Sequence, residues 1–564
     1  MQPLWILSRE SDNNGAGFSW AGLCGSPSIA RLLQRKGFSC EDEVRSFLNP
    51  RLAGLGDPFL LEGMGEIVER IFQAIDRRER VVPFGDYDVD GVTSLALLSG
   101  MLRAYGCEAA LFLPHRIEEG YGLSAEGISR CLKEHCPQLL IAVDCGTSSF
   151  SEIAATHKSG VDVIVLDHHE PKAERPDCLL VNPKLTSPAF TYLCSVGLAF
   201  KLCHALLKTR RIDFDLKAAL DLVALGTVAD IVPLQGDNRI FVKSGSAMLA
   251  KSNRPGIIKL METAAVKPPI MPEDIGFRLG PRLNAAGRLA TAEKALRLLL
   301  TENEIEAERL ARELDAQNRD RQEMEKRVVL EAEQQLSERC DLGRDAAIVL
   351  GAKDWHPGVV GIVASRISKK YHRPTFIVGF DDKGAGKGSG RGIEGFSLIA
   401  ALNECAATLE EFGGHEMAAG ISLLAQNFPR FREMFLAAAG QQLAADALLP
   451  RLHLDAELAL ADVNFDLLHW HEMLQPFGNG NPQPLFVSCQ VEPAAPPRVV
   501  GERHLALRLK QRNWHQRAIF FDGTIAPLPP PPWDVAYRIR SDLYEGETRI
   551  QLQVQALRAA APLD

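Results

Sequence analysis

The chain has 564 residues and a mass of 61.9 kDa, and 46% of its residues are apolar while 24% are charged. This length predicts about three or four domains, and the composition is typical of a folded globular protein and excludes wholesale disorder. No segment approaches the ~18 consecutive apolar residues of a membrane-spanning helix. The N-terminus lacks the basic region of a secretory signal, and twelve cysteines without a C-x-x-C pair favour reduced thiols in a cytoplasm. The net charge of −9 gives no general attraction to nucleic acid, although a local basic surface remains compatible with it.

The first half of the chain predicts a short helical cap followed by an α/β domain. In residues 1–50, we expect helices that turn Leu32, Leu33, Phe38 and Phe47 inward. Beyond them, polar segments of helical length separate short apolar runs, which is the pattern of βαβ units and a parallel sheet. Leu- and Ala-rich helices are expected across 196–300. The predicted strands are 81–85, 109–114, 139–144, 161–167 and 178–183.

Residues 301–340 are highly charged and contain neither Gly nor Pro. A continuous helix over this stretch would be ~60 Å long at 1.5 Å per residue. Its apolar positions are sparse and irregular, so we interpret it as a strut that connects two domains. A dimerising coiled coil is the alternative.

The remainder predicts two further domains. Strands at 346–351 and 375–380, with a helix at 359–371 between them, indicate a second α/β domain that also contains a flexible Gly-rich loop, KGAGKGSGRG. After about residue 450, some five short strands alternate with Pro-rich turns, and this pattern predicts a small β-barrel.

Acidic residues follow the first buried strand at alternating positions. Asp86, Asp88 and Asp90 lie in GDYDVDG, directly after VVPFG. Carboxylates this close repel one another unless a cation neutralises them, so hard metal ions are one explanation. A turn or helix cap rich in Asp is the other, because Asp favours both.

Two later strands also end in candidate ligands. Asp144 ends one strand, and Asp167, His168 and His169 end the next. Side chains at the carboxyl ends of parallel strands converge on one crevice. Imidazole beside carboxylate suits Mn²⁺, Zn²⁺ or Fe²⁺, whereas Mg²⁺ would rely on the oxygens. A histidine of this kind alone is more often a core residue, but three acidic strand ends favour a metal site; Asp230, in LGTVADIVPL, is a weak candidate by itself.

Together, GDYDVDG, VDCG, LDHHE and GTVADIVPL, in this order, resemble the successive motifs of the DHH phosphoesterase superfamily. FGGHEMAAG is similar to the signature of the DHH-associated domain, and GPRLNAAGRL, SGRG and the C-terminal barrel extend the likeness to RecJ-type exonucleases over nearly all of residues 50–560. The expected fold is therefore α/β and multidomain. Its parts are a helical cap (1–50), a parallel-sheet DHH domain (51–300), a long connecting helix (301–342), a smaller α/β DHH-associated domain (343–449) and an OB-like barrel (450–564).

The resemblance implies two divalent metal ions, Mn²⁺ or Mg²⁺, as cofactors. It implies that Asp144 is the bridging ligand and a catalytic residue. His169 would lie beside the scissile phosphate as a hydrogen-bond or proton donor, and Asp167 would support the loop or a histidine. Hydrolysis would use metal-activated water, since G-x-S-x-G is absent and no Ser or Cys has an evident base beside it. The implied metal ligands are Asp88, Asp90, Asp144, His168 and Asp230, with Asp86 as an additional candidate.

Several residues are expected to bind the substrate. Ser389 and Arg391 could cradle a phosphate with backbone N–H groups and a guanidinium, with a mobile surface loop as the alternative. The resemblance adds Arg116 as a ligand of a 5′ phosphate, and His415 is expected to reach the same cleft. In residues 502–517, basic side chains interleaved with an aromatic suit a single strand, whereas a solvated basic hairpin would look similar. The barrel candidates are Arg508, Lys510, Arg512 and Trp514.

The resulting hypothesis is a metal-dependent exonuclease that degrades single-stranded DNA from 5′ to 3′ and releases mononucleotides in DNA repair and recombination. The polarity and the preference for DNA come from the resemblance. From the cysteine usage and the lack of a long apolar segment, we expect a cytoplasmic protein without membrane association, and we expect a monomer. The resemblance implies single-strand-binding protein and a RecQ-type helicase as partners. The alternatives are a DHH phosphodiesterase of short oligonucleotides or cyclic dinucleotides, and a non-catalytic DHH relative that binds single-stranded DNA.

Overall fold

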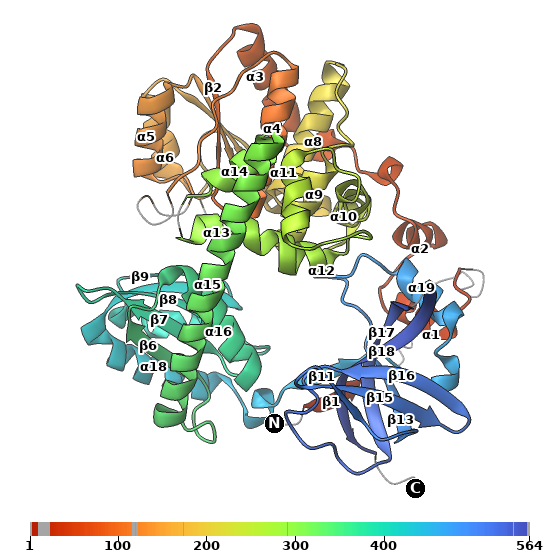
Figure 1. Ribbon diagram of the computed structural model, residues 1–564. Coiled ribbons are helices and arrows are strands. Elements are labelled where there is room, and N and C mark those ends of the chain that lie inside the picture. Colours follow the sequence, from red (N-terminus) through yellow and green to blue (C-terminus); the bar gives the residue numbers. More distant parts are fainter. Residues whose placement is uncertain are drawn as a thin grey trace.

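The computed structural model describes residues 3–8, 23–115, 119, 122–172, 174–289, 291–544 and 546–560. Figure 1 shows two α/β bodies joined by a long green helix, with a blue β-barrel beside them. The bodies surround a central opening in this view, and the N-terminal helices, in red, lie against the barrel rather than forming a separate unit. No helix among the described ranges combines the length and the apolar character needed to cross a membrane.

The first body is built on a four-stranded parallel sheet in the order β2-β3-β4-β5. β2 and β3 are buried along their whole length because helices cover both faces, which explains their continuous apolar sequences. The predicted strand at 109–114 is wrong: Phe112 makes only an isolated bridge to Phe84, since Pro114 has no N–H to extend the pairing. The strands are β2 (Val81–Gly85), β3 (Leu139–Val143), β4 (Asp162–Leu166) and β5 (Leu179–Val181).

Helices surround this sheet and supply most of its hydrophobic core. α4 begins directly after the acidic loop and is buried over nearly its whole length, so it lies at the centre of the body. The larger helices are α3 (Met64–Asp76), α4 (Val89–Ala104), α5 (Ala125–His135), α6 (Phe150–Lys158), α8 (Ser195–Thr209), α9 (Leu220–Ala229), α10 (Gly236–Leu249), α11 (Pro255–Thr263), α13 (Gly280–Leu289) and α14 (Glu293–Leu300).

The charged segment forms one continuous helix, α15 (Glu304–Arg339), which begins at an Asn303 cap. Leu310 and Leu314 of its first half belong to the core of the first body. Val328 and Leu336 of its second half belong to the core of the second body. These four apolar positions serve two different domains in turn, which is the packing expected of a strut. The apolar stripe that they form packs within the chain, while Ile305 and Leu330 of the same helix are exposed.

The second body contains a five-stranded mixed sheet in the order β6-β7-β8-β10-β9. The prediction of a flexible Gly-rich loop is wrong, because residues 385–391 form the central strand β8, paired on both sides. A Cβ at Gly386 would lie 2.5 Å from Phe380, and one at Gly390 would lie 2.4 Å from Phe376, so these glycines make room for aromatic rings. The elements are β6 (Ile348–Lys353), α16 (Pro357–Tyr371), β7 (Thr375–Phe380), β8 (Ala385–Arg391), α17 (Leu398–Glu404), β9 (Glu411–Gly414), β10 (Ala418–Leu424) and α18 (Phe428–Gln442).

The C-terminal body is a closed five-stranded barrel. Its strands follow the order β13-β17-β18-β16-β15, and pairing between β13 and β15 closes the ring, with β12 and β14 at the flanks. They are β12 (Ala456–Glu457), β13 (Phe486–Pro493), β14 (Arg498–Val500), β15 (His504–Gln511), β16 (Trp514–Phe520), β17 (Trp533–Tyr544) and β18 (Glu547–Ala559), and α19 (Phe465–Met473) packs on them.

The N-terminal segment is part of this barrel body. α1 (Pro27–Gln34) and α2 (Glu41–Leu48) share one hydrophobic core with the barrel, with Leu32 and Leu33 buried and Phe38 and Phe47 partly buried against it. The expectation of helices alone misses a strand, because β1 (Leu4–Leu7) pairs in parallel with β11 (Arg451–Leu454). The two ends of the sequence therefore fold together.

Candidate functional site

The acidic loop after β2 is fixed by hydrogen bonds from two helices. Asp88 caps α4, with its Oδ1 accepting hydrogen bonds from the backbone N–H groups of Asp90 (2.9 Å) and Gly91 (3.2 Å). The buried Asp90 carboxylate accepts hydrogen bonds from the N–H groups of Ser195 (2.7 Å) and Val196 (2.8 Å), at the start of α8. The cap interpretation of this sequence therefore holds for Asp88, while Asp90 points between helices into the protein.

Three further side chains meet Asp90 at the carboxyl edge of the sheet. Asp144 follows β3 in a left-handed conformation (φ 65°), and its Oδ1 accepts a hydrogen bond from Ser195 Oγ at 3.1 Å. His168 Nε2 lies 3.4 Å from Asp144 Oδ1, 3.5 Å from Asp230 Oδ2 and 3.9 Å from Asp90 Oδ2. One imidazole nitrogen thus lies within 4 Å of three carboxylates that come from separate parts of the sequence.

The donor atoms form overlapping groups that could hold cations. One group contains Asp86, Asp88 and Asp144, and a second contains Asp144 with His168 and His169. Asp144 belongs to both, which is the position required of a carboxylate shared by two ions. The third group joins Asp90 and Asp230 to Cys194. Cys194 and Ser195 were not predicted as site residues, because no local pattern in the sequence sets them apart.

The donors fit divalent cations. His168 Nε2 and Asp230 Oδ2 are buried and have no hydrogen-bond partner in the part of the chain that the structure describes. Burial and repulsion from Asp88 raise the pKa of Asp90 to about 7, and burial and neighbouring carboxylates also raise the pKa values of Asp144 and Asp230. Burial lowers the pKa of His168 to about 3, which leaves a neutral imidazole with a lone pair to donate. Acids crowded in this way need positive charge to ionise together.

Asp167 organises the second histidine. Its Oδ1 accepts the backbone N–H of His168 (2.7 Å) and lies 2.7 Å from His169 Nδ1, while its Oδ2 accepts the N–H of Thr147 (3.0 Å). Burial opposes ionisation of Asp167, but these hydrogen bonds and the histidines hold its pKa below the ordinary value. Burial is the largest single influence on His169 and favours its neutral form, but the hydrogen bond to Asp167 and the charges of Asp167, Asp86 and Asp88 together outweigh it and raise the pKa of His169. His169 is 40% exposed and oriented through one ring nitrogen.

α13 connects this centre to the second body. Asn284 Oδ1 accepts the N–H of Val89 at 3.1 Å, and a Cβ at Gly287 would lie only 2.6 Å from the carbonyl oxygen of Tyr87 in the acidic loop. The next residue, Arg288, donates a hydrogen bond to the Gly358 carbonyl at the start of α16 (3.3 Å). The sequence motif GPRLNAAGRL therefore packs directly on the candidate metal loop, which the sequence analysis had noted only as part of the resemblance.

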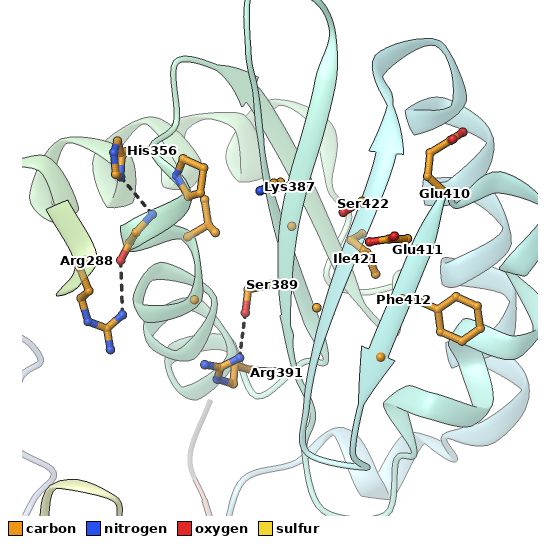
Figure 2. Close-up of a pocket in the computed structure, with 17 residues that line it drawn as sticks. Arg288, His356, Lys387, Ser389, Arg391, Glu410, Glu411, Phe412, Ile421 and Ser422 are labelled. Atoms are coloured by element: carbon orange, nitrogen blue, oxygen red, sulfur yellow. Dashed lines mark hydrogen bonds between the residues drawn. The ribbon is translucent and has the colours of Figure 1, made fainter. Parts of the chain in front are cut away.

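A cleft of about 980 Å³ opens beside Arg288, between α16 and the sheet of the second body. Figure 2 shows Ser389 and Arg391 side by side on β8, with the Arg391 guanidinium bonded to Ser389 Oγ at 2.9 Å. Burial lowers the pKa of Arg391, and no carboxylate lies within ion-pair distance of it among the described residues. Lys387 and His356 also line this cleft, as do Glu410 and Glu411 on its far side.

Three expectations about this cleft need correction or fall outside the structure. The backbone N–H groups of β8 take part in sheet pairing, so only the side chains of Ser389 and Arg391 are available to cradle a phosphate. His415 lies exposed in the turn after β9 and is not among the cleft-lining residues, which include Phe412 and Gly413 of that strand. Arg116 lies outside the described residues.

The basic hairpin of the barrel presents a charged face. Arg508 and Arg517 are exposed and directly opposite each other on β15 and β16, and with Arg549 and Phe465 they line a groove of about 600 Å³. Trp514 is 55% exposed, but strand alternation puts it on the other face of β16, with Gln516 and Ala518. Lys510 pairs with His515 on the arginine face, and Arg512 lies in the turn. The aromatic beside the arginines is therefore Phe465, from α19, rather than Trp514.

Family models match three parts of the chain. They are the N-terminal domain of the DHH family at residues 80–227, the DHHA1 domain at 345–441 and the RecJ OB domain at 454–556. The resemblance seen in the sequence and the expected multidomain α/β fold are confirmed.

Curated relatives and a solved structure cover most of the chain. The chain is 36% identical to the single-stranded-DNA-specific exonuclease RecJ of Dickeya dadantii, over 94% of this chain and 95% of the relative. It is 39% identical to the protein of that name in Bacillus subtilis over 81% of this chain, but it spans only 58% of that longer relative. The crystal structure of RecJ from Thermus thermophilus in complex with Mn²⁺ superposes with a TM-score of 0.85 at 32% identity, covering 100% of this chain and 80% of that one.

Proposed function

Because this chain belongs to the RecJ family of single-stranded-DNA-specific exonucleases, we propose that it hydrolyses single-stranded DNA from the 5′ end and releases mononucleotides. The observation that carries the proposal is the group of buried carboxylates around His168, together with the cleft of the second body, where no carboxylate lies within ion-pair distance of the Arg391 guanidinium among the described residues. The first feature suits phosphodiester hydrolysis, and the second suits recognition of a terminal phosphate.

The metal ligands in this proposal are Asp88, Asp90, Asp144, His168 and Asp230, with Asp86 as an additional ligand. Two bound Mn²⁺ or Mg²⁺ ions would supply Lewis-acid stabilisation of the phosphate and a more acidic water. Ser195 fixes the orientation of both Asp90 and Asp144, through its N–H and its hydroxyl. Asp144 is the shared ligand, because its carboxylate takes part in two of the three donor groups.

His169 acts as a proton or hydrogen-bond donor to the phosphate or the leaving oxygen. Asp167 holds the imidazole through Nδ1 and favours its protonated form, so the accessible edge of the ring can donate. Asp167 itself stays ionised because backbone N–H groups and His169 satisfy its oxygens.

The cleft in the second body selects the DNA end. Arg391, oriented by Ser389, binds the 5′ phosphate, and Arg288 stands between this cleft and the acidic loop. α13 packs on the candidate metal loop and carries Arg288 at the cleft, so a strand whose end is bound by Arg391 would extend toward the residues that would hold the metals. Arg508 and Arg517 on the barrel attract the rest of the strand. Lys510, Arg512, Trp514 and Arg116 remain predicted substrate contacts.

The chain is proposed to act as a monomer in the cytoplasm, with single-strand-binding protein and a RecQ-type helicase as partners expected from the family. Packing of the α15 apolar stripe within the chain supports the monomer over a coiled-coil dimer. Light scattering at micromolar concentration tests this, since a mass near 124 kDa would contradict it, being about twice the 61.9 kDa of one chain.

The decisive experiment compares wild type with Asp144→Asn on strands labelled at either end, with Mn²⁺, Mg²⁺ or a chelator. We expect the wild type to release the 5′ label first as a mononucleotide and to be inactive with chelator. Asp144→Asn should lose more than about 99% of turnover and bind fewer Mn²⁺ ions, while retaining DNA binding. Release of the 3′ label first would refute the polarity, and near wild-type turnover in the variant would refute the shared-ligand assignment.

A further inference from the structure

The segment that follows Asp230 has an unusual backbone. Asp230 ends α9, and the next residue, Ile231, adopts φ 59°, the left-handed region that β-branched residues avoid. The Ile231 side chain is 70% exposed, so burial of this side chain does not compensate for the conformation. Within the segment, the Ile231 N–H donates a hydrogen bond to the Val228 carbonyl at 3.2 Å. Support from outside the segment adds to this bond in holding the left-handed conformation, and loss of that conformation would turn the chain, and the adjoining Asp230 carboxylate, in another direction.

The C-terminal body supplies that support. Asn479 Nδ2 donates a hydrogen bond of 2.7 Å to the Ile231 carbonyl, and the Asn479 carbonyl accepts a hydrogen bond of 2.7 Å from the Leu234 N–H. Asn479 thus contacts both ends of the segment from Ile231 to Leu234. A Cβ at Gly480 would lie 3.0 Å from Pro233, and one at Gly478 would lie 2.6 Å from Leu234, so glycines permit this close approach.

The turn that carries Asn479 is itself firmly anchored. Gly478 and Asn481 exchange backbone hydrogen bonds of 3.0 and 3.1 Å across it, and Asn481 Nδ2 donates to the carbonyls of Leu474 (2.9 Å) and Pro476 (2.8 Å). From the first body, the buried Arg239 donates to the Leu474 carbonyl (2.9 Å) and to that of Gln475 (2.8 Å). The position of Asn479 relative to α9 and α10 is therefore fixed on both sides.

We propose that Asn479 is a positioning residue for the metal centre: it holds the left-handed backbone at Ile231 and thereby keeps the Asp230 carboxylate beside His168. The C-terminal body then contributes to metal binding as well as to DNA binding. This inference rests on the proposed role of Asp230 as a metal ligand. A purely structural role for Asn479 would affect unfolding without changing the affinity for the metal.

The test measures Mn²⁺ binding to the full-length protein by electron paramagnetic resonance of free Mn²⁺, alongside kcat and KM for DNA. In Asn479→Ala, we expect Mn²⁺ binding to weaken about two- to tenfold, the effect of one lost hydrogen bond. kcat should fall at limiting Mn²⁺ and recover at high Mn²⁺, while KM for DNA stays unchanged. Asn479→Asp removes the same donor with little change in shape, and it replaces the alanine variant if that one does not melt cooperatively.

A second substitution at Ile231 tests whether Asn479 acts through the backbone at that residue. Glycine adopts φ 59° without steric cost, so Ile231→Gly added to Asn479→Ala should restore Mn²⁺ binding to near the wild-type affinity. Arg540→Ala is the matched control, because Arg540 contacts Glu273 of the first body (3.9 Å) away from the Asp230 segment, and its Mn²⁺ binding should not change. If the wild type binds no Mn²⁺, the proposed metal centre fails. If the wild type binds it and Asn479→Ala binds it equally well, or if Ile231→Gly gives no rescue, the inference fails.

Discussion

Arg391→Ala should reduce the preference for a 5′-phosphorylated end far more than it slows hydrolysis. The Arg391 guanidinium is ordered before substrate arrives, by Ser389 Oγ (2.9 Å) and the Gly390 carbonyl (2.7 Å), so little rotamer entropy remains to be lost. A hydrogen bond to a charged group contributes about 1.5–3 kcal/mol. At about 1.4 kcal/mol per tenfold, removing this contact should lower the ratio of kcat/KM on 5′-phosphate to that on 5′-hydroxyl strands by about 10- to 150-fold.

The assay uses single strands of one sequence with either end group, at saturating Mn²⁺. Lys387→Ala is the matched control, because Lys387 lies on the same strand and lines the same cleft but has no contact that orients it among the described residues; its ratio should change less than about threefold. Arg391→Lys keeps the charge without the planar guanidinium, so its ratio of kcat/KM on the two substrates should fall between those of the two alanine variants. Equal losses of kcat/KM on both substrates in Arg391→Ala would refute the assignment of this cleft to the terminal phosphate.

Three further predictions concern the barrel, its core and α13. Replacing both Arg508 and Arg517 by Ala should flatten the dependence of log affinity on log salt for long strands by ~0.7 per lost phosphate contact; an unchanged slope in a filter-binding titration would show that this face does not bind DNA. Burial lowers the pKa of His471 to about 4, and neither of its ring nitrogens has a hydrogen-bond partner in the described structure. Because the unfolded chain protonates this histidine first, His471 should cost about 2 kcal/mol of unfolding free energy as the pH falls from 7.5 to 5. In His471→Leu, the free energy of unfolding measured in urea should therefore fall less between these two pH values, by that amount. An identical pH dependence in the two proteins would contradict the assignment. Gly287→Ala should reduce kcat at least tenfold, because its Cβ would meet the Tyr87 carbonyl at 2.6 Å and displace the metal loop; wild-type kcat would show that α13 can move aside.

Deleting the barrel would not be a clean test of its role in DNA binding. Removing residues after about 450 would expose Ile29, Leu33 and Val44 of the N-terminal helices, which share its core. It would also remove the carbonyl partners of Arg239 and the contact of Asn479 with Ile231. Point substitutions on the exposed arginine face separate DNA binding from this structural role, because they leave the shared core intact.

The sequence by itself determined the features that depend on short-range patterns. Apolar runs of strand length followed at once by Asp or His predicted β2, β3 and β4, and these strands do bring Asp90, Asp144 and His168 together at one edge. The reason is geometric: neighbouring parallel strands end at the same edge of a sheet, so the position of a residue just past a strand follows from the pattern alone. The long charged helix was predictable for a similar reason, since nothing in its sequence interrupts it.

Only the tertiary structure decided the features that depend on distant partners. The run of glycines around Gly388 reads as a flexible loop, yet it forms a central strand because Phe376, Phe380 and Ile421 occupy the space that side chains would need. Likewise, no local pattern indicates that Ser195 orients Asp90, or that Asn479 supports the backbone at Ile231 almost 250 residues earlier. In each of these cases, the residue type is favourable only because of an atom contributed by another part of the chain, and that atom's position is set by packing rather than by local sequence.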